Sequence, residues 1–261
     1  MSFIRREVLP GIYHIEDVMG VCMTLLLGRS RMLLIDTGYG LENVEEYIRS
    51  FSDLPLMVLL THGHHDHALG SRWFKEVMLF PEDDKVFETY TGIEQRLRVL
   101  EEARQKGLVF DEAAFLNATM PKIVPLKESV LDLGGMTADI RLCPGHTPGS
   151  AVVYVPERRL LITGDDWNPC TWLFFPEAQS VESYRRNMRK LLFLPFEQIL
   201  CPHRMQIYPR AALERFLAGL TDAQLRAAKD TDLGEFMGIR TAELALPDGQ
   251  VFVFDRTKVE G

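Results

Sequence analysis

Short hydrophobic runs separated by polar turns occupy the first part of the chain and predict β-strands. These runs are GIYHIEDV (residues 11–18), VCMTLLLG (21–28), RMLLID (31–36) and PLMVLLT (55–61). Between the last two, LENVEEYIRSF (41–51) spaces its apolar residues as one helix face: Leu41, Val44, Ile48 and Phe51. Strand, helix and strand in this order predict an α/β fold whose chemistry lies at the C-terminal ends of strands.

Residues 82–118 differ from their surroundings, because they are highly charged and helical in pattern. A stripe of apolar residues recurs at spacings of four and three: Val86, Tyr90, Ile93, Leu97 and Leu100. The pattern predicts a helical insertion that packs this stripe on the core. A cap over an active site and a dimer contact are the two functional alternatives.

Strand-like segments return after the insertion, at residues 128–135, 136–145, 150–156 and 159–166. Helices are predicted at 184–196 and 210–229, with a strand leading into a loop at 198–204 and a hairpin at 241–256 around Pro247-Asp248-Gly249. No internal repeat, low-complexity tract or linker interrupts the chain. We therefore expect residues 1–261 to form a single domain.

Charge and cysteine content narrow the function classes. Lys plus Arg number 29 against 37 for Asp plus Glu, so the net charge of −8 gives no general attraction to a phosphate backbone, and nucleic acid is not expected as a partner. The four cysteines form no C-x-x-C pair, which fits a reducing compartment. There is no signal-peptide pattern and no apolar run of membrane-spanning length, so a cytoplasmic protein without membrane contact is expected.

The stretch THGHHDHALG, residues 61–70, holds four of the seven histidines and an aspartate. Imidazole nitrogens and a carboxylate form a ligand set for Zn²⁺, Fe²⁺ or Mn²⁺. In an extended loop, positions two apart face the same way, so His62 and His64 can share one ion. Asp66 and His67 lie a short step further on and can supply a neighbouring ion.

Further donors follow other predicted strands. They are His146 in PGHTPGS, Asp165 in LLITGDD and His203 in ILCPHR. Taken singly, each is more typical of a turn or surface residue than of a metal ligand. Their common position at strand ends is what favours a shared site.

These motifs together resemble the metallo-β-lactamase-fold hydrolases. The T-H-x-H-x-D-H signature stands at 61–67, and Gly-His-Thr-Pro-Gly at 145–149, Gly164-Asp165 and His203 follow in the family's order. The resemblance extends from Asp36-Thr37-Gly38 to His203. It implies a four-layer αββα sandwich with the metals at the edge where the two sheets meet, here carrying a helical insertion.

The resemblance also implies a role for each ligand. His62, His64 and His146 would hold one metal, and Asp66, His67 and His203 a second, with Asp165 bridging both. Asp36 would orient a ligand histidine, whereas His65 would point away and His14 would be structural. Two divalent ions, Zn²⁺ first and Fe or Mn as alternatives, would share a bridging hydroxide, and Asp66 could act as proton acceptor or donor.

Several subfamilies are disfavoured by their own signatures. The best-known antibiotic-hydrolysing lactamases have cysteine where this chain has Asp165, and flavodiiron proteins usually have Glu at the position of His64. Acyl-homoserine lactonases commonly have Tyr where this chain has Asn168. Glyoxalase II enzymes usually show Gly-His-Glu around the last histidine, which here is Pro202-His203-Arg204. The subfamily is therefore open.

Candidate substrate contacts follow the bridging aspartate. Asn168 could bind a substrate carbonyl or be an ordinary turn residue before Pro169. The aromatic residues Trp167, Trp172, Phe174 and Phe175 are typical of a core, but beside a metal ligand they could line a pocket, and Trp172 and Phe174 are taken as candidates. Arg204 could contact an anionic group or face solvent.

The expected activity is hydrolysis of a small ester, thioester or lactone. A phosphodiesterase or nuclease, a mononuclear-iron persulfide dioxygenase on the same fold, and a non-catalytic binding module are the alternatives. Completeness of the seven ligand positions argues against the binding module and weakens the dioxygenase.

Overall fold

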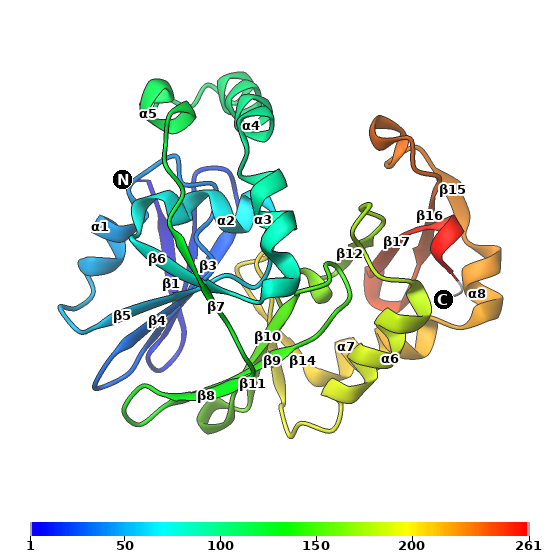
Figure 1. Cartoon of the computed structure of the whole chain (residues 1–261). Helices are drawn as coiled ribbons and strands as arrows, with labels where there is room; N and C mark the ends of the chain where they lie inside the picture. Colours follow the sequence, from blue (N-terminus) through cyan, green and yellow to red (C-terminus); the bar gives the residue numbers. More distant parts are fainter. Residues whose placement is uncertain (1, 260–261) are drawn as a thin grey trace.

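A seven-stranded mixed sheet forms the N-terminal half of the protein, for which a computed structural model describes residues 2–259 (Figure 1). The strands follow one another in chain order, antiparallel from β1 to β4 and parallel from β4 to β7. They are β1 Ile4–Leu9, β2 Ile12–Glu16, β3 Cys22–Leu27, β4 Met32–Ile35, β5 Leu56–Leu59, β6 Glu76–Leu79 and β7 Lys122–Pro125. The strand runs expected from the sequence in this half are all present.

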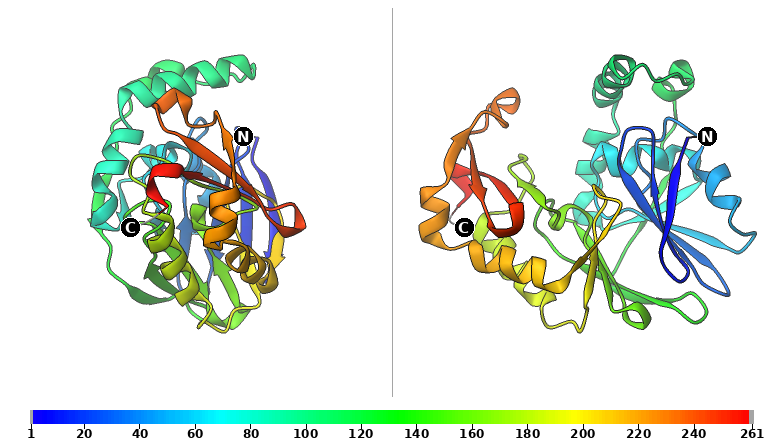
Figure 2. Two further views of the ribbon diagram at one scale, coloured as in Figure 1. Left: turned by 90° about the vertical axis from the view of Figure 1, so that its right-hand side faces the viewer. Right: turned by 180° about the vertical axis from the view of Figure 1, so that it is seen from behind.

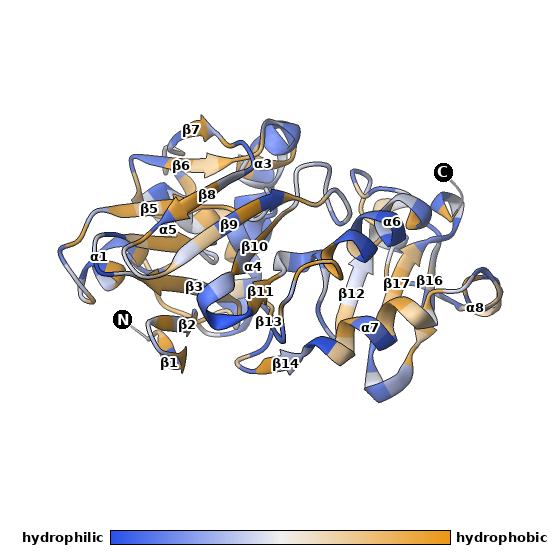
Figure 3. Ribbon diagram, turned by 90° about the horizontal axis from the view of Figure 1, so that it is seen from below, coloured by the Kyte–Doolittle hydropathy of each residue, from blue (hydrophilic) through white to orange (hydrophobic). Residues whose placement is uncertain are grey.

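A second sheet of six strands packs face to face with the first. Its order is β14-β13-β11-β10-β9-β8. The strands are β8 Ser129–Asp132, β9 Thr137–Leu142, β10 Ala151–Val155, β11 Leu160–Ile162, β13 Gln198–Leu200 and β14 Ile207–Pro209. A buried apolar layer that includes Leu33, Ile35, Ile140 and Val153 fills the space between the sheets. In Figure 3 strands such as β5 and β6 carry hydrophobic stretches, and β4, β10 and β11 are buried along their whole length, as central strands covered on two faces require.

Helices cover the outer face of each sheet. On the first sheet lie α1 Val44–Arg49, α2 His65–Ala68 and α3 Asp84–Tyr90, and on the second lie α6 Val181–Leu191 and α7 Arg210–Gly219. Residues on the inward faces, such as Ile48 of α1 and Met188 of α6, are fully buried. The predicted αββα arrangement is confirmed.

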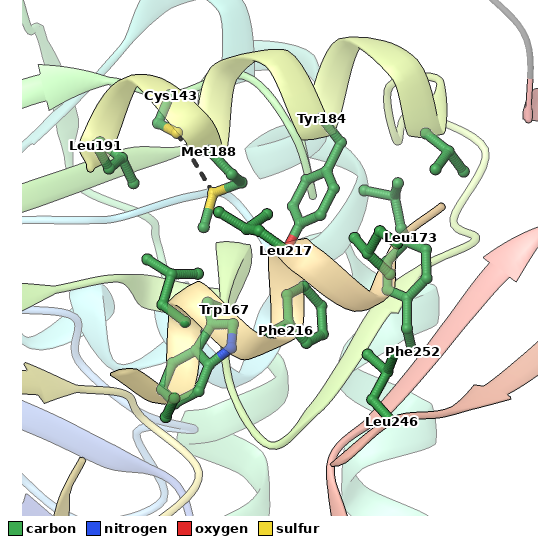
Figure 4. Close-up of a cluster of buried hydrophobic side chains, with 14 of the residues drawn as sticks. Cys143, Trp167, Leu173, Tyr184, Met188, Leu191, Phe216, Leu217, Leu246 and Phe252 are labelled. Atoms are coloured by element: carbon green, nitrogen blue, oxygen red, sulfur yellow. Dashed lines mark hydrogen bonds between the residues drawn. The ribbon is translucent and has the colours of Figure 1, made fainter. Parts of the chain in front are cut away.

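A third sheet extends this arrangement beyond four layers. It has the order β12-β17-β16-β15 and lies beyond α6 and α7, at the end of the molecule opposite the N-terminal sheet (Figures 1 and 2). Its strands are β12 Cys170–Leu173, β15 Lys229–Thr231, β16 Thr241–Ala245 and β17 Val251–Asp255, and β16 and β17 form the predicted hairpin. The third sheet lies beside α6 and α7 because it shares a hydrophobic core with them. In Figure 4, Phe252 and Leu246 pack with Trp167, Tyr184 and Phe216 in one buried cluster. The hairpin thus buries its apolar face against the helices instead of exposing it to water.

The 82–118 insertion contains three helices, and the predicted stripe was wrong in part. Besides α3 these are α4 Ile93–Gln105 and α5 Glu112–Leu116. Ile93 and Leu97 are exposed, because a break at Thr91-Gly92 changes the phase between α3 and α4, and α4 buries Val99 and Ala103 instead. The buried Arg96 guanidinium donates to the carbonyls of Thr91, Leu116 and Ala118 and so ties the break between α3 and α4 to the C-terminal end of the insertion.

The single helix expected at 210–229 is two helices. α7 ends at Gly219 and α8 spans Asp222–Ala227, with the Thr221 hydroxyl accepting from the Gln224 amide as the cap of α8. A threonine at this position favours a helix start over a helix interior. Short 3-10 helices complete the chain: η1 Leu69–Trp73, η2 Pro81–Asp83, η3 Pro156–Arg158, η4 Gly164–Asp166, η5 Glu235–Met237, η6 Pro247–Gly249 and η7 Arg256–Lys258.

Candidate metal centre

The seven predicted ligands meet at one edge of the two central sheets. The 61–67 loop follows β5 of the first sheet, whereas His146, Asp165 and His203 follow β9, β11 and β13 of the second. The side chains form two groups, each with ligand atoms within 4.8 Å of one another. The first group is His62, His64 and His146, and the second is Asp66, His67, Asp165 and His203.

The first group consists of three buried imidazoles. Nε2 of His146 lies 2.8 Å from Nδ1 of His64. The other ring nitrogens are held from behind, since Nδ1 of His146 lies 2.7 Å from the carbonyl of Trp172 and Nδ1 of His62 lies 3.0 Å from the Thr61 hydroxyl. Burial, followed by the neighbouring imidazoles, lowers the pKa of His62 well below its ordinary value. The ring is therefore neutral, which is the form that binds metal.

The second group mixes imidazoles with carboxylates. The Asp165 carboxylate lies 3.0 Å from Nε2 of His203, 3.6 Å from Nε2 of His67 and 3.8 Å from Nε2 of His146. It therefore stands between the two groups, as a bridging ligand would. Asp66 Oδ2 lies 3.5 Å from Nε2 of His67. Burial opposes ionisation of Asp165, but the adjacent imidazoles of His203 and His67 outweigh it and hold its pKa well below the usual range.

The chemistry of these donors fits divalent metal ions. Nε2 of His62 and Nε2 of His67 are both buried without a hydrogen-bond partner. A buried polar atom left unpaired costs roughly 1–3 kcal/mol, so such atoms in one place indicate a bound group. Nitrogen and oxygen donors of this kind suit zinc, iron or manganese.

The strand-end residue Asp36 holds the second group from behind. Its Oδ2 lies 2.9 Å from Nδ1 of His67, and its Oδ1 accepts from the backbone amide of Thr61. The backbone of Asp36 adopts a φ of 61°, a left-handed conformation that residues other than glycine rarely take. The carboxylate thus lies where the family resemblance implied, with Nε2 of His67 left free for a metal.

A second buried aspartate, Asp83, joins the two ligand loops, and sequence reasoning missed it. Its carboxylate accepts from the amides of Gly63 and Gly149 and from the Thr147 hydroxyl. Glycine at position 63 lets the ligand loop lie close against α3, because a Cβ there would lie 2.4 Å from the amide nitrogen of Phe87 in that helix. The PEDD sequence reads as a solvent-exposed acidic run, and nothing in it marks the middle acid as buried.

Glu177 was also missed. Its Oε1 lies 2.5 Å from Nε2 of His64, so a carboxylate from the loop before α6 contacts the first ligand group. The sequence context PEAQ carries no motif that would have pointed to this role.

A cavity of about 400 Å³ opens over both groups. Its lining is Met19, Gly20, Val21, Tyr39, His64, His65, Asp66, Tyr90, His146, Asp165, Asn168, Cys170, Trp172, Phe175, His203 and Arg204. Asn168, Trp172 and Arg204 therefore line the cavity, and their contact with a substrate stays a prediction. The Asn168 side-chain oxygen accepts from the Cys170 amide, so it also acts as a turn residue.

Two predictions about this cavity need correction. Phe174 is fully buried and is absent from the lining, because it follows β12 into the core, and its neighbour Phe175 faces the cavity instead. His65 belongs to neither ligand group, but it does not point away: it lines the cavity between the rings of Tyr39 and Tyr90. His14 is structural as expected, since its ring contacts the Thr24 hydroxyl and the Cys201 carbonyl.

The family follows from this ordered ligand set and from comparison with known proteins. The metallo-beta-lactamase superfamily model matches residues 18–203, well over half of the chain. The chain belongs to the metallo-beta-lactamase superfamily. Its fold and its hydrolase relatives make it a metal-dependent hydrolase of that superfamily.

Three similar proteins illustrate the relationship. The acyl-coenzyme A thioesterase MBLAC2 of Gallus gallus is 25% identical over 241 residues, covering 83% of this chain and 80% of that protein. MBLAC2 of Bos taurus is 27% identical over 172 residues, so the alignment spans 56% of this chain and only 60% of the bovine protein. The solved structure of TTHA1623 in a di-iron-bound form is 25% identical, with a TM-score of 0.54, and covers 76% of this chain and 93% of that one. No helix within residues 2–259 is long and apolar enough to cross a membrane.

Proposed function

We propose that this protein hydrolyses acyl thioesters with two divalent metal ions held by the two ligand groups. Zinc is the expected metal, and iron and manganese are the alternatives. The observation that carries the proposal is an apolar wall directly above the ligands. Trp172, Phe175, Met19 and Val21 line one cavity together with His64, Asp66, His146 and Asp165. An acyl chain on this wall would place its carbonyl over the ligand groups. The similarity to an acyl-coenzyme A thioesterase supports the same substrate class.

The chain's own residues would position and desolvate the substrate. Arg204 lies at the cavity and is exposed, so its guanidinium can pair with an anionic group on the thiol part of the substrate. The aromatic wall removes water from around the carbonyl, which strengthens electrostatic interactions there. Asp66 lines the same space and can accept or donate a proton at its carboxylate. When bound, two metal ions supply a hydroxide nucleophile at neutral pH and a Lewis acid for the developing oxyanion.

A substrate panel on the zinc-loaded protein tests the proposal. It comprises acetyl, octanoyl and palmitoyl coenzyme A, a lactone, a p-nitrophenyl ester and bis-(p-nitrophenyl) phosphate, with thiol release or absorbance as readout. Elemental analysis and a persulfide assay are made in parallel on protein purified without chelator and without added metal. We expect about two metals per chain and hydrolysis of the acyl thioesters at the highest kcat/KM. Phosphodiester cleavage beside inert acyl substrates would establish a phosphodiesterase instead. One iron per chain with oxygen uptake on a persulfide would establish the dioxygenase.

A further inference from the structure

The ligand histidine His64 uses its ring in the opposite sense to its neighbours. His62, His67 and His146 each have Nδ1 held from behind by a protein oxygen and Nε2 facing the ligand groups. In His64 it is Nδ1 that faces the group, 2.8 Å from Nε2 of His146, and Nε2 that faces away. For Nδ1 of His64 to bind a metal, the ring proton must reside on Nε2. Nε2 then needs a hydrogen-bond acceptor to hold the ring in this orientation.

Glu177 supplies that acceptor from a loop that is fixed in place. Its Oε1 lies 2.5 Å from Nε2 of His64, and its side chain is only 15% exposed. The loop between β12 and α6 is clamped by the Lys258 ammonium, which donates to three of its carbonyls, those of Phe175, Pro176 and Ala178. The Gln179 amide also donates to the carbonyl of Gly145, next to the ligand His146. The carboxylate is thus presented to His64 by a backbone held at several points.

Tyr90 connects the same carboxylate to the helical insertion. It is the last residue of α3, and its hydroxyl interacts electrostatically with the Glu177 carboxylate. Its ring also packs on His64 with centroids 4.3 Å apart. The 82–118 insertion therefore reaches the first ligand group through one side chain.

We propose that Glu177 is a positioning residue that fixes His64 with Nδ1 toward the first metal, and that Tyr90 acts through Glu177 to couple the insertion to that metal. The proposal rests on the metal site of the proposed function and is independent of the substrate. Metal ligands oriented by an outer carboxylate typically lose 10- to 100-fold in metal affinity when that partner is removed.

Metal affinity, measured without substrate, tests the proposal. The full chain, stripped and reloaded with Zn²⁺ against a chromogenic chelator, is compared with Glu177→Ala, Glu177→Gln and Tyr90→Phe, and the Co²⁺-loaded proteins give visible spectra. Glu182→Ala, which removes an exposed glutamate of α6, is the matched control. We expect Glu177→Ala to weaken one of two ions by roughly 10- to 100-fold and to alter the Co²⁺ spectrum. Glu177→Gln should recover part of the loss, because its amide oxygen can still accept from Nε2.

The double variant separates a relay from two independent effects. Tyr90→Phe alone should weaken the same ion by a smaller factor, and Tyr90→Phe combined with Glu177→Ala should be no weaker than Glu177→Ala. Additive losses would overturn the coupling, and unchanged affinity in Glu177→Ala would overturn the positioning role. If Glu177→Ala fails to fold by circular dichroism, wild-type affinity in both Glu177→Gln and Tyr90→Phe overturns the proposal equally. If Glu177→Ala alters metal affinity while the wild-type protein fails to hydrolyse thioesters, only the proposed function is refuted.

Discussion

The Asp36 carboxylate lies 2.9 Å from Nδ1 of His67 and links the end of β4 to the second ligand group. Without it, the His67 ring loses the partner that keeps Nε2 free and directed at the metal. We therefore expect Asp36→Ala to reduce affinity for one of the two ions by roughly 10- to 100-fold, measured by chelator competition.

Asp53→Ala is the control for this change, since it removes an exposed aspartate from a turn before β5. Equal metal affinity in Asp36→Ala and Asp53→Ala would show that the His67 ring is oriented by other contacts. Thermal unfolding should be measured in parallel, because Asp36 also accepts from the Thr61 amide.

Variants of Asp165 and His65 distinguish a ligand shared by both metals from a neighbouring residue that only lines the cavity. Asp165 stands between the two groups, so Asp165→Ala should remove the anion that offsets repulsion between two close cations, and with it most of one metal and of the activity. His65→Ala should leave metal content nearly unchanged. Elemental analysis decides: metal loss in His65→Ala as severe as in His67→Ala would mean that the ligands are wrongly assigned.

The residues of the two groups could be located from the sequence because each belongs to a local motif at the end of a recognisable strand, and the family resemblance supplied their expected roles as ligands. Strand periodicity placed β5, β9, β11 and β13, and residues at the ends of these strands meet at one sheet edge. Asp36 was found in the same way, as a carboxylate after a buried run. The cytoplasmic location and the dimer contact stay predictions.

The missed residues act through contacts made across long sequence separations. Glu177 is 113 positions from His64, and Asp83 is 66 positions from Gly149, so neither lies in a local pattern. Phe174 and Phe175 are adjacent aromatics, and only the packing beyond α6 and α7 determines which one faces the cavity. The position of the third sheet could not be predicted either, because the sequence showed the hairpin but not the helices against which it packs.

Asp83 should contribute strongly to stability. Asp83→Ala leaves the amides of Gly63 and Gly149 without their acceptor in a buried place, which we expect to cost about 3 kcal/mol of unfolding free energy. Asp83→Asn keeps an acceptor oxygen and should lose less. Urea unfolding of the metal-free proteins measures both, with the exposed Asp84→Ala as control. An Asp83→Ala protein as stable as this control would contradict the role in joining the loops.

His14 should make stability fall in mild acid. Burial lowers the pKa of His14 to about 4 from an ordinary value of 6.5. Between these two values the unfolded chain takes up a proton that the folded chain refuses, so the stability that His14 contributes is lost as the pH falls from about 6.5 to 4. The loss approaches about 3 kcal/mol, at 1.36 kcal/mol per pKa unit.

The comparison with His14→Gln isolates this effect, because the ligand histidines titrate in both proteins. The unfolding free energy of the wild type minus that of the variant should decrease between pH 7 and pH 4 in urea titrations. A difference that stays constant over this range would show that His14 does not titrate differently in the two states.

Trp172 should select the acyl group without holding metal. Its side chain is 37% exposed at the cavity, whereas its contact with His146 Nδ1 is made by its backbone carbonyl. Trp172→Ala therefore keeps that contact and removes only the indole's share of the apolar wall, while Phe175, Met19 and Val21 remain. We expect kcat/KM for an octanoyl thioester to fall by about tenfold, near 1.4 kcal/mol of lost apolar contact, with little change for the acetyl thioester and full metal content. Equal losses on both thioesters, or loss of metal, would place the acyl chain elsewhere in the cavity.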